Sequence, residues 1–357
     1  MITRRHFLAA LPGAWLTAKS FPRLLAAGRE EATPASPAKL LRVGVSDKVV
    51  DPSAQKPAEL MPASSKYCKI LQFTDLHLFQ NTDDFNELTL RDCRQQVEWH
   101  KPDLVVITGD SWHNNVDGSG IRALEYLVEA VSGWKTAWAF CWGNHDQLDD
   151  YPRGHDLLAG APHCLYRGGQ AHGHYRVEIR AAAAGPASAP LMDLFFLNSG
   201  MAGLGSVSLD WLRTTTASLK SARSQPLPAL AFFHIPITEY ETRIAGGNFR
   251  GTKLESVGPL EKGAEVYGAL TAAKTIRACY CGHCHVNDYA VKTGDLELVF
   301  GRASGRAGYG GEFLRKGAKL IEIELATGKP QQRTVFADGA EWLAWQRGTS
   351  AGLRLNG

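Results

Sequence analysis

The chain has 357 residues, of which 44% are hydrophobic and 21% charged, and this composition is typical of a globular protein with enough apolar residues for a core. Its formal net charge of +3 at pH 7 is too small to indicate binding to nucleic acid or to an acidic membrane surface. No apolar run approaches the roughly 18–20 residues of a membrane-spanning helix, so no integral membrane span is expected.

The first residues are typical of an export signal. Arg4 and Arg5 come directly before an apolar stretch over residues 7–16, which is too short to cross a bilayer comfortably. Paired arginines followed by Phe-Leu resemble a twin-arginine signal, which predicts the twin-arginine export machinery as a partner and a periplasmic or extracellular location. An amphipathic first helix is the alternative. We therefore assign residues 1–38 to the signal and a flexible linker rich in Pro, Ala and Ser.

Strands and helices alternate in the next part of the chain. Residues 69–73, 104–108 and 136–142 are short apolar runs of the kind found in buried strands. Two helical patterns lie between them, the first passing through Val97 and the second beginning near Ser119. This βαβαβ order predicts an α/β fold with a mostly parallel sheet.

The second half of the chain is richer in strands. Apolar runs predict them over residues 175–180, 194–197, 230–233, 278–281, 296–300 and 319–323. Helices are expected over 208–219 and 264–273, and the Ala/Gly/Pro-rich residues 181–190 indicate a loop at a hairpin tip. Without an internal repeat or a further linker, the simplest division is one domain over residues 39–337 and a tail over 338–357.

The chain contains seven cysteines, an odd number at a density far below that of a disulfide scaffold. Most of them are expected to be buried as small apolar side chains. Some of them could pair in an exported protein, but the odd count leaves at least one unpaired or engaged elsewhere, and we assign no disulfide.

Five polar clusters each follow an apolar strand. They are Asp75-Leu76-His77, Gly109-Asp110, Gly143-Asn144-His145-Asp146, His234 before Ile235-Pro236, and Gly282-His283-Cys284-His285. Ligands of open α/β sheets bind at the carboxyl ends of the strands, so we expect these clusters to converge. The glycines at 109, 143 and 282 permit the sharp turns and close backbone approach that this needs. Carboxylate and imidazole donors suit Mn, Fe, Zn or Co.

This order of motifs resembles the calcineurin-like metallophosphoesterase superfamily, over roughly residues 67–325. The resemblance implies a four-layer αββα sandwich of two mixed sheets with flanking helices, and two metal ions. One ion would be held by Asp75, His77, Asp110 and His285. The other would be held by Asp110, Asn144, His234 and His283, with Asp110 bridging the two.

A finer likeness, including Gly308-Tyr309-Gly310-Gly311, is to proteins of plants and fungi that are related to purple acid phosphatases. Purple acid phosphatases place Tyr three residues after the bridging Asp, where this chain has His113, and Asp-x-Gly where it has Asp75-x-His77. The violet iron–tyrosinate chromophore is therefore expected to be absent.

The resemblance implies hydrolysis of a small phosphate ester, with a phosphomonoester preferred. Two cations about 3.5–4 Å apart can share a hydroxide that attacks the phosphorus in line. His145 is the expected general acid, and Asp146 or a backbone carbonyl is expected to orient it. His113, Asn114 and Arg302 are the expected substrate contacts.

Three other functions compete with this one. A phosphodiesterase or nuclease could use the same metal site, although neither the near-neutral charge nor export favours nucleic acid as the substrate. Cys281-Gly282-His283-Cys284-His285 matches the attachment pattern of c-type haem, but haem would leave the other clusters unexplained. A binding module without metal should have lost ligands, and here the set is complete.

Overall fold

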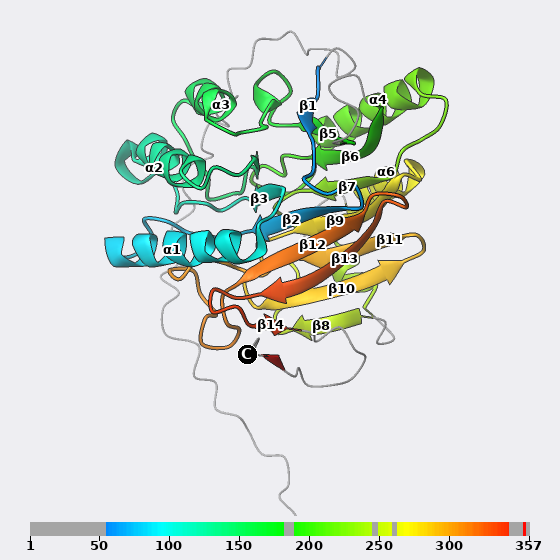
Figure 1. Cartoon of the computed structure of the whole chain (residues 1–357). Coiled ribbons are helices and arrows are strands. Elements are labelled where there is room, and N and C mark those ends of the chain that lie inside the picture. Colours follow the sequence, from blue (N-terminus) through cyan, green and yellow to red (C-terminus); the bar gives the residue numbers. More distant parts are fainter. Residues whose placement is uncertain (1–54, 182–188, 245–248, 259–262, 343–352, 355–357) are drawn as a thin grey trace, which may run out of the picture. The chain divides into compact units, whose positions relative to one another are not determined.

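The computed structural model describes residues 55–181, 189–244, 249–258, 263–342 and 353–354. These residues form two mixed β-sheets with helices on their outer faces (Figure 1). The predicted signal and linker over residues 1–38 lie outside the described part of the chain. Among the described residues, no helix is long and apolar enough to cross a membrane.

The seven-stranded sheet contains the predicted βαβαβ unit. Strands β2 (Tyr67–Phe73), β3 (Leu104–Thr108) and β4 (Trp138–Cys141) are parallel, because α1 (Asp83–His100) and α2 (Gly120–Ser132) return the chain between them. The later strands pair antiparallel on the other side of β2, in the order β12 (Ala318–Glu324), β13 (Lys329–Val335), β14 (Glu341–Trp342) and β15 (Leu353–Arg354). Because β14 pairs with β13, residues beyond 337 add to this sheet.

The eight-stranded sheet is also mixed. Its order is β1 (Ala58–Leu60), β5 (Tyr175–Arg180), β6 (Pro190–Phe196), β7 (Ala229–Phe232), β9 (Ile276–Cys281), β11 (Leu296–Phe300), β10 (Asn287–Thr293) and β8 (Phe249–Lys253). Strands β6, β7, β9 and β11 are parallel, so their carboxyl ends share one edge. Strands β5 and β6 are antiparallel neighbours, which agrees with the predicted hairpin, although residues 182–188 are not described.

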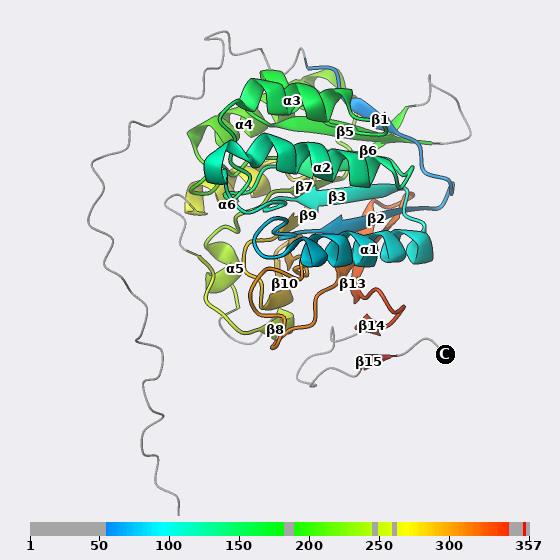
Figure 2. The same ribbon diagram turned by 90° about the vertical axis from the view of Figure 1, so that its left-hand side faces the viewer.

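The remaining α-helices are α3 (Tyr151–Gly160), α4 (Ser206–Ala222), α5 (Glu239–Thr242) and α6 (Gly263–Ala272), of which α3 and α5 were not predicted from the sequence patterns. Alternation along β6 shows how the layers form: Leu194 and Phe196 belong to the core between the two sheets, whereas Phe195 packs with α4 and α6 on the outer face. Helices α1 and α2 cover the seven-stranded sheet (Figure 2). The result is the predicted four-layer αββα arrangement.

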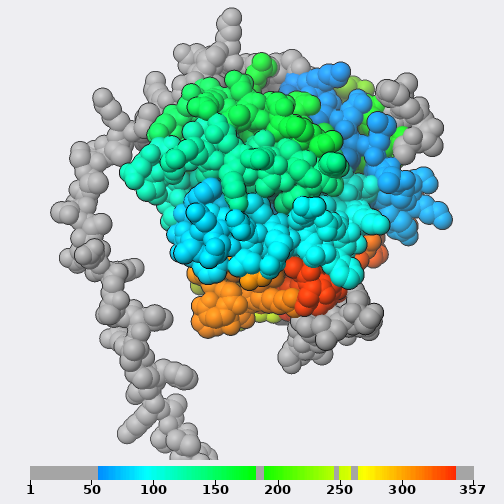
Figure 3. Space-filling view, turned by 60° about the vertical axis from the view of Figure 1, so that its left-hand side comes forward, coloured from blue at the N-terminus to red at the C-terminus, as the bar shows by residue number. Residues whose placement is uncertain are grey.

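The loop over residues 301–317, between β11 and β12, lies against α1 (Figure 3, where the loop is orange and α1 cyan). The backbone N–H of Arg306 donates to Oγ1 of Thr89 at 3.0 Å, and Nε of Arg306 donates to Asp92 at 2.7 Å. The other side of this loop contacts His285, one of the expected metal ligands.

All seven cysteines lie in the described part of the chain, and each is buried as a free thiol. Burial raises their thiol pKa values, because the charged thiolate is poorly solvated in an apolar core. The expectation that most of the cysteines are buried is confirmed.

Candidate metal centre

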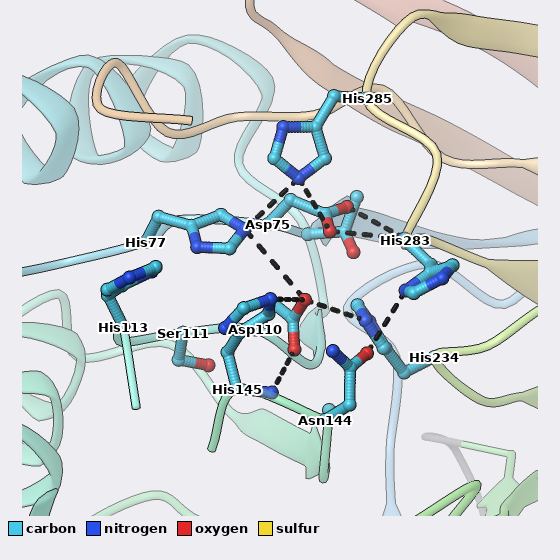
Figure 4. A network of polar contacts seen from close by, with 12 residues as sticks. Asp75, His77, Asp110, Ser111, His113, Asn144, His145, His234, His283 and His285 are labelled. Atoms are coloured by element: carbon cyan, nitrogen blue, oxygen red, sulfur yellow. Dashed lines mark hydrogen bonds and ion pairs between the residues drawn. The ribbon is translucent and has the colours of Figure 1, made fainter. Parts of the chain in front are cut away.

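The five polar clusters predicted from the sequence meet where strands of both sheets end. Asp75 and His77 follow β2, Asp110 follows β3, His234 follows β7, and His285 follows β9. Because these strands are parallel within each sheet, their carboxyl ends lie at a common edge. Figure 4 shows the side chains facing one another. The seven side chains predicted as metal ligands therefore come together.

The first group of donors is Asp75, His77 and His285, here called cluster one, whose ligand atoms lie within 4.8 Å of one another. Nε2 of His285 lies 3.3 Å from Oδ1 of Asp75, and Nε2 of His77 lies 3.1 Å from Nε2 of His285. All three side chains are buried. Two imidazole nitrogens and a carboxylate aimed at one point form a site that could hold a divalent cation.

The second group is Asp110, His234 and His283, here called cluster two. Nε2 of His234 lies 3.0 Å from Oδ2 of Asp110, and Nδ1 of His283 lies 3.0 Å from Oδ1 of Asn144. The same Oδ2 of Asp110 lies 3.8 Å from Nε2 of His77 in cluster one. Asp110 therefore stands between the two clusters.

Backbone carbonyls set which nitrogen two of the histidines present. Nδ1 of His234 lies 2.7 Å from the carbonyl oxygen of Thr108, and Nδ1 of His285 lies 3.3 Å from that of Tyr309. A carbonyl only accepts, so these Nδ1 atoms carry a proton and the Nε2 atoms point toward the carboxylates. Histidines that bind metals in proteins are held in this way, and the donor set thus fits a pair of cations.

The electrostatics of the site also suit metal binding. Burial lowers the pKa of His77 to about 3 and that of His283 to about 4, so both imidazoles are neutral at pH 7. Burial also acts to lower the pKa of His234, but Asp110 and Asp75 outweigh it and raise this pKa to about 9. A cation bound at cluster two would take the place of that proton.

The predicted role of the three glycines agrees with the geometry. A Cβ on Gly143 would lie 2.2 Å from the backbone N of Asp110, and one on Gly282 would lie 1.9 Å from Oγ1 of Thr74. Gly109 has a φ of +86° and leads into Asp110, which itself has a φ of +51°. Left-handed backbone at a non-glycine residue costs about 1–2 kcal/mol. The fold therefore holds the bridging carboxylate in an unfavourable backbone conformation.

His145 lies at the edge of the two clusters. Its backbone N–H donates to Oδ1 of Asp110 at 2.8 Å, and its Nε2 lies 4.0 Å from Oδ2 of the same residue. Its Nδ1 lies 2.8 Å from Oδ1 of Asn114. The side chain is 31% exposed, so a substrate could reach it.

The prediction that Asp146 orients His145 is wrong. The carboxylate of Asp146 accepts the backbone N–H groups of Ser111 and Gly143 at 2.7 Å each and therefore ties two turns together. Burial and the nearby Asp110 raise the pKa of Asp146 to about 7. Asn114, predicted as a substrate contact, is the residue that contacts the imidazole of His145. Chain turns bring Asn114 to His145, so no sequence pattern identifies it as the partner.

His113 stacks on His145, with ring centroids 5.1 Å apart and planes at 18°. One nitrogen each of His77, His113 and His145 lies within 4.8 Å of the others. Nδ1 of His77 is buried and has no hydrogen-bond partner among the described residues. His113 therefore lies beside the clusters, and its role as a substrate contact stays a prediction.

Arg302 does not reach the clusters, and the expected substrate contact is corrected here. Its guanidinium is buried, its Nε donates to Oδ2 of Asp288 at 2.6 Å, and its Nη1 donates to the carbonyl oxygen of Arg315. It also lies over the ring of Trp342, 4.5 Å from the centroid. Arg302 is therefore a structural anchor.

The geometry also contradicts attachment of haem through Cys281 and Cys284. The thiol of Cys281 is fully buried in the apolar layer beneath α5 and α6, and Cys284 is buried in the same layer. His285, the axial ligand of such a haem, faces Asp75 and His77 instead.

An αββα fold with Asp, Asn and His donors gathered at strand ends defines a class of metal-dependent hydrolases. A family model described as calcineurin-like phosphoesterase matches residues 68–287, and the chain belongs to this family. The resemblance inferred from the motifs is confirmed.

Relatives in plants and fungi support the finer likeness. The chain is 29% identical over 312 residues to probable inactive purple acid phosphatase 28 of Arabidopsis thaliana, covering 73% of this chain and 76% of that protein. It is 26% identical over 320 residues to phosphatase DCR2 of Saccharomyces cerevisiae, covering 78% of this chain and 53% of the yeast protein. Among solved structures, a dimetal phosphatase from Danio rerio matches 80% of this chain and 98% of its own, with 12% identity and a TM-score of 0.46.

Proposed function

We propose that this protein is a dinuclear metal-dependent phosphoesterase that prefers phosphomonoesters. The observation that carries the proposal is the position of Asp110, whose Oδ2 lies 3.0 Å from Nε2 of His234 in cluster two and 3.8 Å from Nε2 of His77 in cluster one. A carboxylate shared by two groups of imidazole and carboxylate donors is what a pair of adjacent cations requires.

Each cluster would hold one ion. Asp75, His77 and His285 would bind the first together with Asp110, and His234, His283 and Asn144 would bind the second together with Asp110. Mn, Fe, Zn and Co all suit these donors. When bound, two such cations would lower the pKa of water and neutralise charge on the phosphoryl oxygens.

His145 would give a proton to the leaving alkoxide. The contact between its Nδ1 and Asn114 leaves Nε2 facing the clusters, and its partial exposure leaves room for the leaving group. A general acid placed in this way typically contributes about 10²–10⁴ in rate.

The names of the relatives differ in the activity they state. Three plant relatives are named probable inactive purple acid phosphatases, whereas the yeast relative is named a phosphatase. Activity here is supported by the complete donor set and by the imidazole of His145 beside Asp110.

The test uses purified protein loaded separately with Mn, Fe, Zn and Co, with metal per chain measured by elemental analysis. Rates on p-nitrophenyl phosphate and on bis(p-nitrophenyl) phosphate are then compared. We expect two ions per chain and faster hydrolysis of the monoester. Faster hydrolysis of the diester would favour a phosphodiesterase, and two ions without hydrolysis would indicate a metal-binding module. A chain that binds no ion would overturn the proposal.

We also propose export through the twin-arginine machinery, supported by Arg4 and Arg5 before a short apolar stretch. Replacing both residues by Lys should retain the protein in the cytoplasm. Unchanged export of this variant would contradict the proposal.

A further inference from the structure

One residue of the 301–317 loop makes three contacts with His285 of cluster one. The ring of Tyr309 stacks on the imidazole, with centroids 4.0 Å apart and planes at 12°. The carbonyl oxygen of Tyr309 lies 3.3 Å from Nδ1 of His285, and its hydroxyl accepts the backbone N–H of His285 at 3.3 Å. Tyr309 thus holds both the ring and the backbone of one candidate ligand.

Glu255 holds Tyr309 in turn. The hydroxyl of Tyr309 donates to Oε2 of Glu255 at 2.8 Å, while Oε1 of Glu255 accepts the backbone N–H of Val286 at 3.0 Å. Val286 is the neighbour of His285, so Glu255 links Tyr309 to the segment that carries the imidazole. Nζ of Lys316 donates to the carbonyl oxygen of Tyr309 at 2.6 Å, which fixes the direction of that carbonyl.

The loop is closed at its base by buried polar groups. Arg302 donates to the carbonyl oxygen of Arg315 at 2.9 Å, and Oγ of Ser304 donates to that of Gly317 at 2.7 Å. The buried carboxylate of Asp288 holds Arg302 in place. These contacts keep the path of the loop fixed relative to both sheets.

Gly308 shows how closely the loop backbone approaches the cluster. A Cβ at this position would lie 2.7 Å from Cε1 of His285 and 3.3 Å from Cδ2 of His77. The first distance is too short for any side chain, so only glycine lets the loop pass over the two imidazoles.

We propose that Tyr309 is a positioning residue of the metal centre, which aims Nε2 of His285 at Asp75 and His77 through its carbonyl, its ring and its bond to Glu255. The inference rests on the proposed function, since it assigns Tyr309 a role toward the ion of cluster one. Partners of metal-binding histidines typically change metal affinity about 10–100-fold when they are removed. The ring and the Glu255 bond are the parts of this support that a mutation can remove.

The experiment compares Tyr309→Ala, Tyr309→Phe and Glu255→Gln with the wild-type chain. Phe313→Ala is the matched control, because Phe313 lies on the same loop and its side chain is 73% exposed. Zn affinity of each ion is measured by competition with a chelator, and the Co(II) absorption spectrum reports the ligand geometry. We expect Tyr309→Ala to weaken one ion about tenfold and to change the Co(II) spectrum. Tyr309→Phe and Glu255→Gln keep the ring stack and should lose less affinity, while Phe313→Ala should match the wild type.

Wild-type affinity for both ions and an unchanged spectrum in Tyr309→Ala would overturn the inference, and so would equal weakening of both ions. If Tyr309→Ala does not fold, Tyr309→Phe and Glu255→Gln decide, because both alter the hydrogen bond between Tyr309 and Glu255. Wild-type affinity for both ions in these two variants would then overturn the inference. A wild-type chain that binds no ion would refute the proposed function itself. If the wild-type chain binds two ions and the variants bind them with the same affinity, only this inference is refuted.

Discussion

The side-chain oxygen of Asn114 lies 2.8 Å from Nδ1 of His145, and this contact determines which nitrogen of the imidazole faces Asp110. The amide oxygen only accepts, so Nδ1 carries a proton and Nε2 remains for exchange with a substrate. Nε2 of Gln147 donates to the same oxygen at 3.2 Å and so holds the amide in this orientation.

Asn114→Ala should therefore lower kcat more than it changes KM, because the ring of His145 loses its orientation while the donor clusters stay intact. We expect a loss of about tenfold, smaller than the roughly 10²–10⁴ expected for His145→Ala. Steady-state kinetics across pH would measure both. Asn115→Ala is the control: Asn115 accepts the backbone N–H of Gly120 at 2.8 Å and should affect stability only. A kcat equal to that of the wild type in Asn114→Ala would argue against this role.

Asp110→Ala should reduce metal content more than any other single replacement, because its Oδ2 lies near the donors of both clusters. We expect loss of both ions, whereas His285→Ala should lose one. Elemental analysis of the dialysed proteins checks this. Retention of one ion in Asp110→Ala would show that the carboxylate is not shared.

Gly143→Ala should distort the candidate metal centre, because the added Cβ would lie 2.3 Å from Oδ1 of Asp110. We expect lower metal content and lower stability. Gly268→Ala in α6 is the matched control, since no atom lies within 4 Å of its added Cβ. It should stabilise the helix by about 0.5–1 kcal/mol. Urea unfolding and elemental analysis of the two variants measure this. Wild-type metal content and stability in Gly143→Ala would contradict the prediction.

Asp288 is fully buried and bonded to two cations, the guanidinium of Arg302 and the ammonium of Lys319. Asp288→Ala would remove the carboxylate that both buried charges contact, and we expect a loss of about 3–5 kcal/mol in the free energy of unfolding. Glu98→Ala breaks an exposed pair with Arg94 and should cost less than about 1 kcal/mol. Similar losses of free energy of unfolding in the two variants would contradict this role of Asp288.

The same carboxylate should contribute to acid sensitivity. Burial acts to raise the pKa of Asp288, but Arg302 and Lys319 outweigh it and hold the pKa below the ordinary 3.8. A carboxyl group with a lowered folded-state pKa stabilises the fold above its unfolded pKa, and this contribution is lost as the pH falls below about 4. The free energy of unfolding should therefore drop more between pH 5 and pH 3 in the wild type than in Asp288→Asn. Equal drops would exclude Asp288 as a source.

The sequence patterns located the strands that carry the site more reliably than those at the outer positions of the sheets. Strand β3 is an uninterrupted apolar run that ends at Gly109-Asp110, and both its burial and its donor follow from that pattern. Strand β13 reads Lys-Pro-Gln-Gln-Arg-Thr-Val and is polar with an internal Pro330, so only its pairing with β12 makes it a strand.

At the site, too, the residues that could be predicted are those carried by strands. His77 and His285 could be named from strand ends because parallel strands deliver their carboxyl ends to one edge. The partners Asn114 and Tyr309 could not, because loops bring them to His145 and His285, and the path of a loop is set by tertiary contacts. The Gly-rich residues 308–311 indicate a loop, but the sequence does not identify the side chain that this loop approaches.

Because all seven thiols are buried, oxidants and alkylating reagents should react only slowly with the folded protein. A chain that entered an oxidising compartment unfolded would expose all of them at once and could become trapped by mispaired disulfides. Passage through a membrane in the folded state would avoid this hazard. Thiol labelling of the native protein should proceed only as fast as unfolding exposes the thiols. The labelling rate would therefore measure the rate of that unfolding.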